Sequence, residues 1–205
     1  MRCIADGGER SGGVVHVNDH DIQRLPPYSC VAFGIGRKFQ TANVFETLTV
    51  AEALRVARTR LARPTLWQRS EVLALPEASL QVIRATGLDQ QLATQARYLS
   101  HGLKQALELS MVLALEPSVL LLDEPTAGLT KPERTRIGQI LVELARNHQL
   151  CILLVEHDLD FVREISSRVI VLHLGRIVLD GTVADVVESE LVRTIYSGAA
   201  AAPAT

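Results

Sequence analysis

The chain has 205 residues, 47% of them hydrophobic and 21% charged, and a net charge of −2. This balance gives no basis for binding nucleic acid or an anionic membrane, so any anion site must be local. The composition is that of one globular domain in a reducing cytoplasm, because three cysteines at unpatterned spacings favour neither a disulfide framework nor a zinc site, and neither a membrane span nor a signal peptide is present.

The first residues are rich in glycine but lack the side chains of a phosphate-binding loop. Such a loop needs a Lys for the β- and γ-phosphates and a Ser or Thr for Mg²⁺. After the glycines of residues 7–13, Val14 and Val15 stand at those two positions. The segment is therefore not a phosphate loop.

Two short strands are predicted next, at Val14–Val17 and Val31–Phe33, with a turn at Asp19–Asp21 between them. Gly34 and Gly36 form a lone GxG. We interpret it as a flexible turn before Gln40, because a single GxG is weak evidence for phosphate binding.

A helical region is predicted from Thr49 to about Thr94. Thr49 and Glu52 form a capping box at its start, and Gly87 is a predicted helix stop. A basic stretch around Pro64 contains Arg55, Arg58, Arg60, Arg63 and Arg69. Such a stretch is typical of a solvated helix face.

A further helix is predicted to begin after Ser100, which can cap it. Apolar residues follow at helical spacing, namely Leu103, Leu107, Met111 and Ala114. Gly102 would let a phosphate approach the backbone at this helix start. The alternative is an ordinary capped core helix.

Two acids follow a predicted strand at Val119–Leu122, which the apolar run indicates is buried on both faces of a parallel sheet. Ligands gather at the carboxyl ends of such strands, so Asp123 and Glu124 would meet phosphates there. One acid can serve Mg²⁺ and the other can polarise an attacking water. The alternative is an ordinary turn at the end of a strand.

A second buried strand is predicted at Cys151–Val155, followed by Glu156 and His157. A histidine after a parallel strand can hydrogen-bond a γ-phosphate or position water, although such histidines are often structural. The order of the helix start, the acid pair and the histidine favours a nucleotide triphosphate site.

The remaining elements alternate between helices and strands. Lys131–Glu133 begins a helix whose apolar face carries Ile137, Ile140, Leu141 and Leu144. A helix after His157 and a hairpin turning at Gly175 precede one last amphipathic helix, which Thr182 caps with Asp185 and which ends at Ser197–Gly198. Residues 199–205 are predicted to be a disordered tail.

In this order, the motifs resemble those of the nucleotide-binding subunit of an ABC transporter. Residues 99–105 (LSHGLKQ) resemble the signature motif, residues 120–125 (LLLDEP) the Walker B strand and residues 155–158 (VEHD) the switch-histidine loop. Residues 34–40 (GIGRKFQ) resemble the Q-loop. The GIGRKFQ segment, His101 within the signature motif and His173 near the end are most similar to the urea and branched-chain amino acid importer branch. The resemblance extends over residues 11–197.

The resemblance implies an α/β, P-loop NTPase-like domain over residues 1–198, with a parallel core sheet and a helical subdomain at about 49–115. Residues 1–5 resemble the helix that follows the phosphate loop. On this basis the first strand, the Walker A loop and the adenine-stacking aromatic are missing, and ATP binding is expected to be weakened.

The resemblance also implies ATP and Mg²⁺ as cofactors and a role for each motif residue. Glu124 would polarise the attacking water, His157 would hold the γ-phosphate, and Asp123 and Gln40 would attend Mg²⁺. Ser100 and Gly102 would face the ATP held by a second subunit. Thr130 stands where the family's D-loop usually has Asp.

The expected partners are two transmembrane permease subunits, a second ATP-binding subunit in a homo- or heterodimer and, indirectly, a solute-binding protein, without nucleic acid. The chain would lie in the cytoplasm on the inner face of the membrane and power import of urea or branched-chain amino acids or amides. Phe45 and Trp67 are candidates for the permease contact, or else core residues.

Two alternative functions remain. One is a non-catalytic chain that lends its signature motif to a partner's ATP. The other is a soluble ABC ATPase of DNA repair or translation, which the near-neutral charge and the single domain disfavour.

Overall fold

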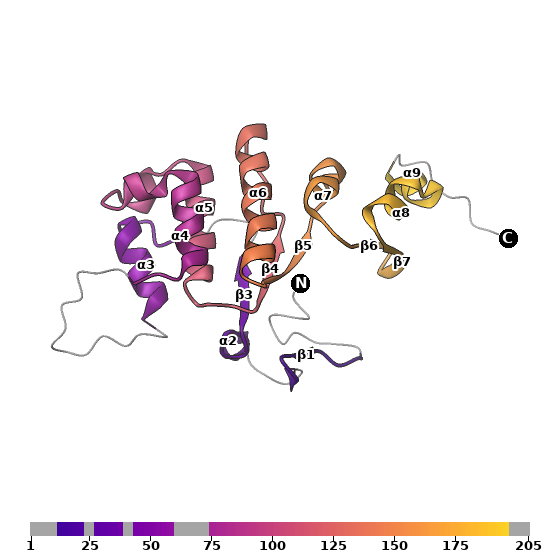
Figure 1. The fold of residues 1–205 in the computed structure, drawn as a ribbon, viewed down its shortest axis with the longest axis horizontal. Coiled ribbons are helices and arrows are strands. Elements are labelled where there is room, and N and C mark those ends of the chain that lie inside the picture. The colour runs from indigo at the N-terminus through magenta and orange to yellow at the C-terminus, as the bar shows by residue number, and fades with distance from the viewer. Residues whose placement is uncertain (1–11, 23–26, 39–42, 60–73, 197–205) are drawn as a thin grey trace. The chain divides into compact units, whose positions relative to one another are not determined.

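A computed structural model describes residues 12–22, 27–38, 43–59 and 74–196, which belong to two compact units, Met1–His157 and Asp158–Thr205 (Figure 1). Gln40, Trp67 and three arginines of the basic stretch, Arg60, Arg63 and Arg69, lie outside the described residues. Each unit is considered by itself below.

The first unit is built on a three-stranded parallel sheet in the order β3-β4-β5. Its strands are β3 (Ile35–Lys38), β4 (Val119–Asp123) and β5 (Cys151–Val155). The register places Leu122 between Lys38 and Leu154, and Asp123 opposite Val155. The predicted parallel sheet is therefore confirmed, and all three strands end at one edge.

β4 is the central strand, and Leu120, Leu121 and Leu122 are at most 1% exposed. β5 differs from its prediction as a buried strand, because Leu153 and Val155 are 38% and 44% exposed. The reason is its place in the sheet. Among the described residues β5 pairs with β4 alone and forms an edge.

The prediction for residues 31–36 is wrong in type. Val31–Phe33 is a 3₁₀ turn, η1, after the short helix α2 (Pro27–Cys30), and the strand is β3, within the GxG segment. Gly34 reverses the chain with φ +85°, and Gly36 is needed because a Cβ there would lie 2.6 Å from Val112 Cγ1.

A small hairpin precedes this region. It pairs β1 (His16–Val17) with β2 (His20–Asp21). The turn lies at Asn18 and Asp19, both with positive φ, so it begins one residue earlier than predicted. Val17 packs with Ile35 and Leu121 in a core under the sheet.

Helices of the first unit bury a second apolar core. It is formed by α3 (Val50–Arg58), α4 (Glu77–Thr86) and α5 (His101–Leu113), with 3₁₀ turns η2 (Leu88–Gln91) and η3 (Ala96–Tyr98). The long helix α6 (Lys131–Asn147) buries apolar residues of its own, including Ile140 and Leu144. The predicted capping box is present, since Thr49 N donates to Glu52 Oε2 at 2.8 Å and Glu52 N donates to Thr49 Oγ1 at 3.3 Å. Gly87 ends α4 with φ +76°, as predicted.

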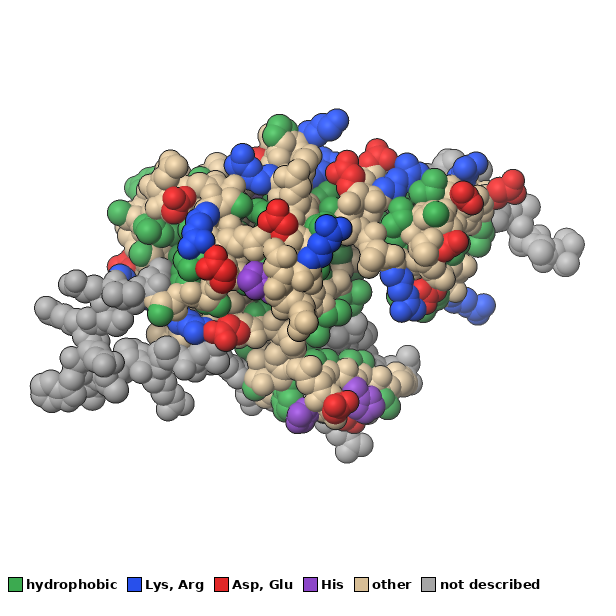
Figure 2. Space-filling view, viewed as in Figure 1, with side chains coloured by type: hydrophobic (Ala, Val, Ile, Leu, Met, Phe, Trp, Pro, Cys, Tyr) green, Lys and Arg blue, Asp and Glu red, His purple; other side chains and the backbone are tan. Residues whose placement is uncertain are grey.

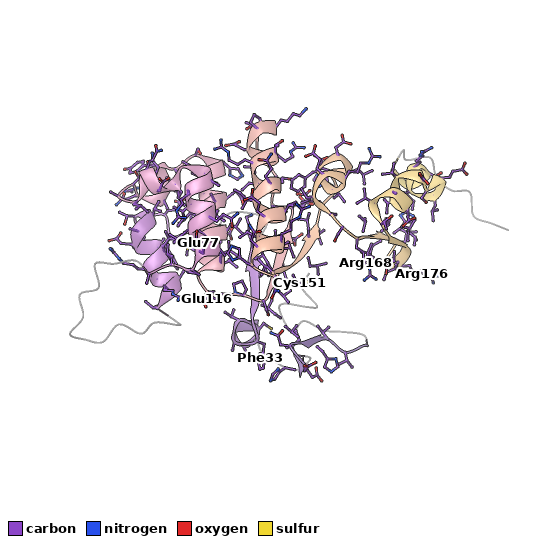
Figure 3. The ribbon with its side chains drawn as sticks, viewed as in Figure 1. Phe33, Glu77, Glu116, Cys151, Arg168 and Arg176 are labelled. Carbon is purple, nitrogen blue, oxygen red and sulfur yellow. The ribbon has the colours of Figure 1, made fainter. Side chains whose placement is uncertain are left out.

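The second unit pairs β6 (Val169–His173) with β7 (Arg176–Gly181) in an antiparallel hairpin after α7 (Leu159–Ile165). Arg168, labelled in Figure 3, donates two hydrogen bonds to the Asp180 carboxylate at 2.7 and 2.8 Å. The last helix was predicted as one, but extended backbone at Ser189 divides it into α8 (Val183–Glu188) and α9 (Glu190–Tyr196).

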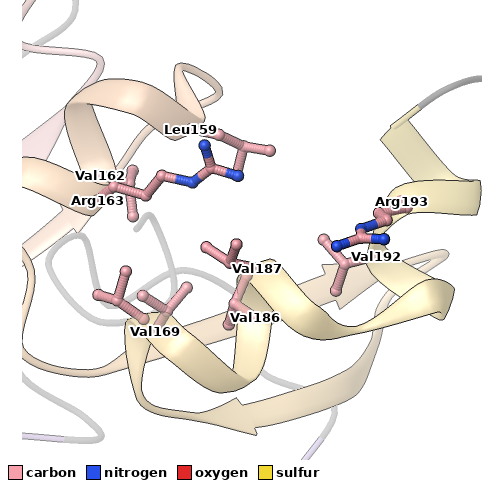
Figure 4. A pocket seen from close by; sticks show the side chains of 9 residues that line it. Leu159, Val162, Arg163, Val169, Val186, Val187, Val192 and Arg193 are labelled. Atoms are coloured by element: carbon pink, nitrogen blue, oxygen red, sulfur yellow. The ribbon is translucent and has the colours of Figure 1, made fainter.

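The same unit encloses a cavity of about 370 Å³, which is lined by aliphatic side chains and two arginines (Figure 4). Its walls are formed by α7, the start of β6, α8 and α9. None of the residues predicted to bind nucleotide lines it.

Charged side chains of both signs are interspersed on the face drawn in Figure 2. This agrees with the near-neutral sequence and gives no sign of a basic patch there. No helix in the described part of the chain has the length and apolar character needed to cross a bilayer.

Leu121 and Leu153 are opposite each other in the sheet, so they form a matched pair for testing its burial. Leu121→Ala should lower the free energy of unfolding by about 3 kcal/mol because it empties a core position. Leu153→Ala should cost less than about 1 kcal/mol because the side chain is already part-exposed. Urea unfolding measures both, and equal losses would contradict the edge position of β5.

Candidate functional site

The predicted acids and histidine emerge at one edge of the sheet because β4 and β5 are parallel and in register. Asp123 is the last residue of β4 and lies opposite Val155. One residue further, Glu124 N donates to Val155 O at 2.9 Å. Pairing of the two strands therefore continues into the segment that carries the second acid.

Glu124 and His157 approach each other at this edge. His157 Nδ1 lies 3.7 Å from Glu124 Oε1, with the two side chains 74% and 31% exposed. A carboxylate and an imidazole predicted from separate motifs thus share one solvent-facing site. Both can exchange protons or hydrogen bonds with a ligand there.

Glu124 also has an uncommon backbone conformation, with φ +45°. A left-handed residue other than glycine costs on the order of 1–3 kcal/mol and persists only where its surroundings hold it. Here the N–H is bound by Val155 O, and the carbonyl accepts from Ala127 N at 3.1 Å. Strained residues of this kind cluster at functional sites.

Glu156 is a member of the site to which the sequence analysis gave no role. Its side chain is 1% exposed, and Thr126 Oγ1 donates to Glu156 Oε1 at 2.6 Å. The sequence holds no signal for it, because Cys151–Val155 is apolar at every position and no alternation marks one face. In the structure Ile152, Leu154 and Glu156 lie on the more buried face of the strand.

A buried ion pair flanks the segment that contains Gln40. Lys38, 2% exposed, places its Nζ 3.6 Å from Glu108 Oε2, and Asn43 N donates to Glu108 Oε1 at 3.3 Å. Burial lowers the pKa of Lys38 below its ordinary value, and the nearby Glu108 opposes that fall. The residues just before and just after 39–42 are thus bound to one carboxylate of α5.

Ser100 caps α5 as predicted, because its Oγ accepts from Leu103 N at 3.3 Å. The amides of the first turn form an anion-favouring helix start. Gly102 has a packing reason within the chain, since a Cβ at this position would collide with Glu133 Oε1. A group does lie close to the backbone of Gly102, and in this structure it is the Glu133 carboxylate.

His101 joins this helix start to the loop that follows the acids. Its Nε2 is 3.1 Å from Ala127 O, and its ring lies against Gly128, which has φ +75°. Thr130, the departure from the family's D-loop, donates from N and Oγ1 to Glu133 Oε2 at 2.9 and 2.6 Å. These bonds lower the pKa of Glu133, with His101 adding to the effect.

The donor set fits Mg²⁺ in a nucleotide complex. Mg²⁺ in such sites is held by one or two carboxylates together with phosphate oxygens, rather than by an all-protein cage. Asp123, the last residue of β4, supplies such a carboxylate at the edge where Glu124 and His157 meet. The residues present are therefore suited to a metal that arrives with a phosphate.

Comparison with known proteins shows the family to which the chain belongs. The ABC transporter family matches residues 1–127. The branched-chain amino acid transport ATP-binding protein LivG of Escherichia coli K12 is 30% identical, over 98% of this chain and 82% of LivG. The sulfate/thiosulfate import ATP-binding protein CysA of Mycobacterium bovis is 32% identical, over 92% of this chain and 51% of CysA. The ADP conformation of MJ1267, an ATP-binding cassette of an ABC transporter, shares the fold with a TM-score of 0.77 at 22% identity, over 96% of this chain and 81% of MJ1267.

The contact between His101 and Gly128 can be tested with a matched pair of glycines. Gly128→Ala and Gly87→Ala both place a side chain at positive φ, but no atom lies within 4 Å of a Cβ at Gly87, whereas His101 Nε2 lies 3.1 Å from one at Gly128. Gly128→Ala should therefore cost about 1 kcal/mol more.

Chemical denaturation of the two variants, with and without His101→Ala, measures this difference. In the His101→Ala background the excess cost should disappear. An excess that persists without the imidazole would show that His101 does not pack against the loop.

Proposed function

Since the chain belongs to the ABC transporter family of ATP-binding subunits, in the branch of the branched-chain amino acid importers, we propose that it hydrolyses ATP to drive solute import. The observation that carries this proposal is the meeting of Glu124 and His157, 3.7 Å apart, at the carboxyl edge of the parallel sheet. Catalysis of phosphoryl transfer depends on positioning and electrostatics, which such an edge provides.

Each side chain has a distinct task in this proposal. Glu124 accepts a hydrogen bond from the attacking water and orients it toward the γ-phosphate, while its left-handed backbone fixes the direction of approach. His157 donates a hydrogen bond to a γ-phosphate oxygen. Asp123 and Gln40 would hold Mg²⁺, which when bound neutralises charge that develops on the phosphates.

The signature residues act between two copies or between this chain and a related subunit. Ser100 and Gly102 lie at the start of a 13-residue helix, whose N-terminus favours an anion. We place them against the triphosphate held by the partner. His101 then connects that contact to the loop after Glu124 within the same chain, because it binds Ala127 O.

The permease contact is proposed at a groove of about 250 Å³ between α3, α5 and the end of β3. Phe45 lines this groove and is 55% exposed, with Val56, Ala57, Met111, Val112 and Leu115 forming apolar walls. An exposed aromatic beside an apolar groove suits the apolar face of an amphipathic helix. A cytoplasmic helix of a permease subunit has this chemistry, and the chain would lie on the inner face of the membrane through it.

The solute is proposed to be a branched-chain amino acid, an amide or urea. The similarity to LivG supports a branched-chain amino acid, and the sequences of the Q-loop and signature segments support urea. CysA, named for sulfate and thiosulfate, is as similar in identity, so similarity alone does not choose the solute. Uptake of labelled leucine and labelled urea by the assembled transporter distinguishes the two.

A second candidate is a non-catalytic subunit that lends Ser100 and Gly102 to a partner's ATP. It is supported by the start of α5, where Ser100 caps the helix and the amides of the first turn favour an anion. In this case the partner's phosphate loop supplies the Lys and hydroxyl that hold phosphates and Mg²⁺. This candidate predicts hydrolysis only when a partner with its own phosphate loop is added.

Glu124→Gln should lower kcat for ATP by at least about 100-fold, because the amide no longer accepts a proton from water. The Kd for ATP should change less than about threefold, because the amide keeps the size of the side chain. Phosphate release and labelled-ATP titration of the purified chain measure the two, with the exposed Glu188→Gln as control.

Two results would contradict the catalytic role. One is full turnover by Glu124→Gln. The other is a parent chain that neither binds nor hydrolyses ATP alone but raises hydrolysis by an added subunit that has a phosphate loop, which would favour the non-catalytic candidate.

Phe45→Ala should weaken co-purification with the permease subunits in detergent by about tenfold or more, because aromatic anchors dominate such contacts. ATP affinity should stay unchanged. Leu174→Ala is the matched control, because Leu174 is 88% exposed and lies in the hairpin of the second unit. Equal retention of both variants by the permease would refute the groove as the docking site.

A further inference from the structure

Glu156 places a buried carboxylate between two segments of the candidate site. Its side chain is 1% exposed. One oxygen, Oε1, accepts from Thr126 N at 3.3 Å and from Thr126 Oγ1 at 2.6 Å. Thr126 is itself 6% exposed, so these bonds are shielded from water and bind the loop after Glu124 firmly.

The other oxygen serves the histidine segment. Glu156 Oε2 accepts from His157 N at 3.3 Å and lies 3.8 Å from His157 Nδ1. Glu156 is itself the first residue after β5, so one carboxylate oxygen binds the loop that follows β4 and the other binds the next residue of its own segment. Glu124 and His157, the residues proposed for catalysis, belong to these two segments.

We propose that Glu156 is a positioning residue that holds the loop of Glu124 and the segment of His157 in one arrangement. The inference rests on the proposed function for its consequence, since the arrangement matters through the roles of Glu124 and His157. A buried carboxylate needs donors on its oxygens, and a segment that moves away leaves an oxygen unsatisfied at substantial cost. The two segments therefore move together.

The same contacts continue toward the signature helix. Thr126 O accepts from Leu129 N at 3.1 Å, and the intervening Ala127 O binds His101 Nε2 at 3.1 Å. A displacement at the start of α5 is thereby passed to the Thr126 loop and, through Glu156, to His157. In a two-subunit site, a nucleotide that contacts the start of α5 would therefore affect the position of His157 in the same chain.

Amide hydrogen exchange of the free chain, followed by NMR, tests the positioning without nucleotide. In Glu156→Gln the amide oxygen can still accept from Thr126, but the NH₂ group faces the His157 N–H donor, so His157 N–H should exchange at least about tenfold faster. In Thr126→Val the backbone N–H of residue 126 should also exchange faster. In Thr126→Ser, which keeps the hydroxyl, that N–H should keep most of its protection from exchange. Exchange in the β4–β5 ladder, for example at Leu121, should stay unchanged in each variant.

Turnover separates positioning from general stability. In Glu156→Gln and in Thr126→Val, kcat for ATP should fall at least about tenfold while Kd for ATP stays within about twofold. Exposed Glu164→Gln should match the parent chain. Thr126→Val guards against the possibility that the charge change at Glu156 unfolds the chain.

Unchanged exchange at both amides overturns the proposal, as does faster exchange with unchanged kcat or an ATP affinity that falls in step with kcat. A parent chain without hydrolysis counts against the proposed function instead. In that case the exchange rates alone decide whether Glu156 holds the two segments together.

Discussion

The parallel pairing of β4 with β5 is the constraint on which the site depends. Because the strands run in the same direction with Asp123 opposite Val155, the residues after both strands emerge at the same edge. An antiparallel pairing would put the acids and the histidine at opposite ends of the sheet. The hydrogen bond from Glu124 N to Val155 O extends the pairing by one residue and ties the acid to the neighbouring strand.

Two unfavourable features are concentrated at that edge, and each is compensated locally. Glu124 has a left-handed backbone, which backbone bonds to Val155 and Ala127 hold in place. Glu156 is a carboxylate removed from water, which donors from Thr126 and His157 satisfy. Such features lower the stability of a fold and persist where they serve a function. In the proposed function they keep the acid and the imidazole in a fixed arrangement.

Local signals predicted much of the fold. Thr49 with Glu52, Ser100, Gly87 and the apolar run of β4 each depend on neighbours within a few residues, so the sequence predicted their roles correctly.

The failures depend on distant contacts. The lone GxG predicts a turn at Gly34 and Gly36, but Gly36 lies in β3, where Val112 of α5 leaves no room for a Cβ.

Burial was the other property that local pattern could not decide. The apolar sequence of β5 is typical of a strand covered on both faces, whereas its burial in the structure depends on which strands pair with it. The same limit applies to the site. The order of the motifs predicts Glu124 and His157 as site residues. The role of Glu156 depends instead on its hydrogen bond with Thr126, thirty residues earlier, which no local pattern indicates.

The edge position of β5 gives the Glu156 contact added weight. A central strand is held from both sides, so the residues that follow it inherit a fixed position from two ladders. Among the described residues, β5 has the β4 ladder on one side only, and His157 is 74% exposed. Side-chain bonds from the residues that follow β5 therefore add to the support of a single ladder. The Glu156 carboxylate provides such bonds, because it joins the segment of His157 to the loop after Glu124 through Thr126. It thereby adds a side-chain link to the backbone bond between Glu124 N and Val155 O.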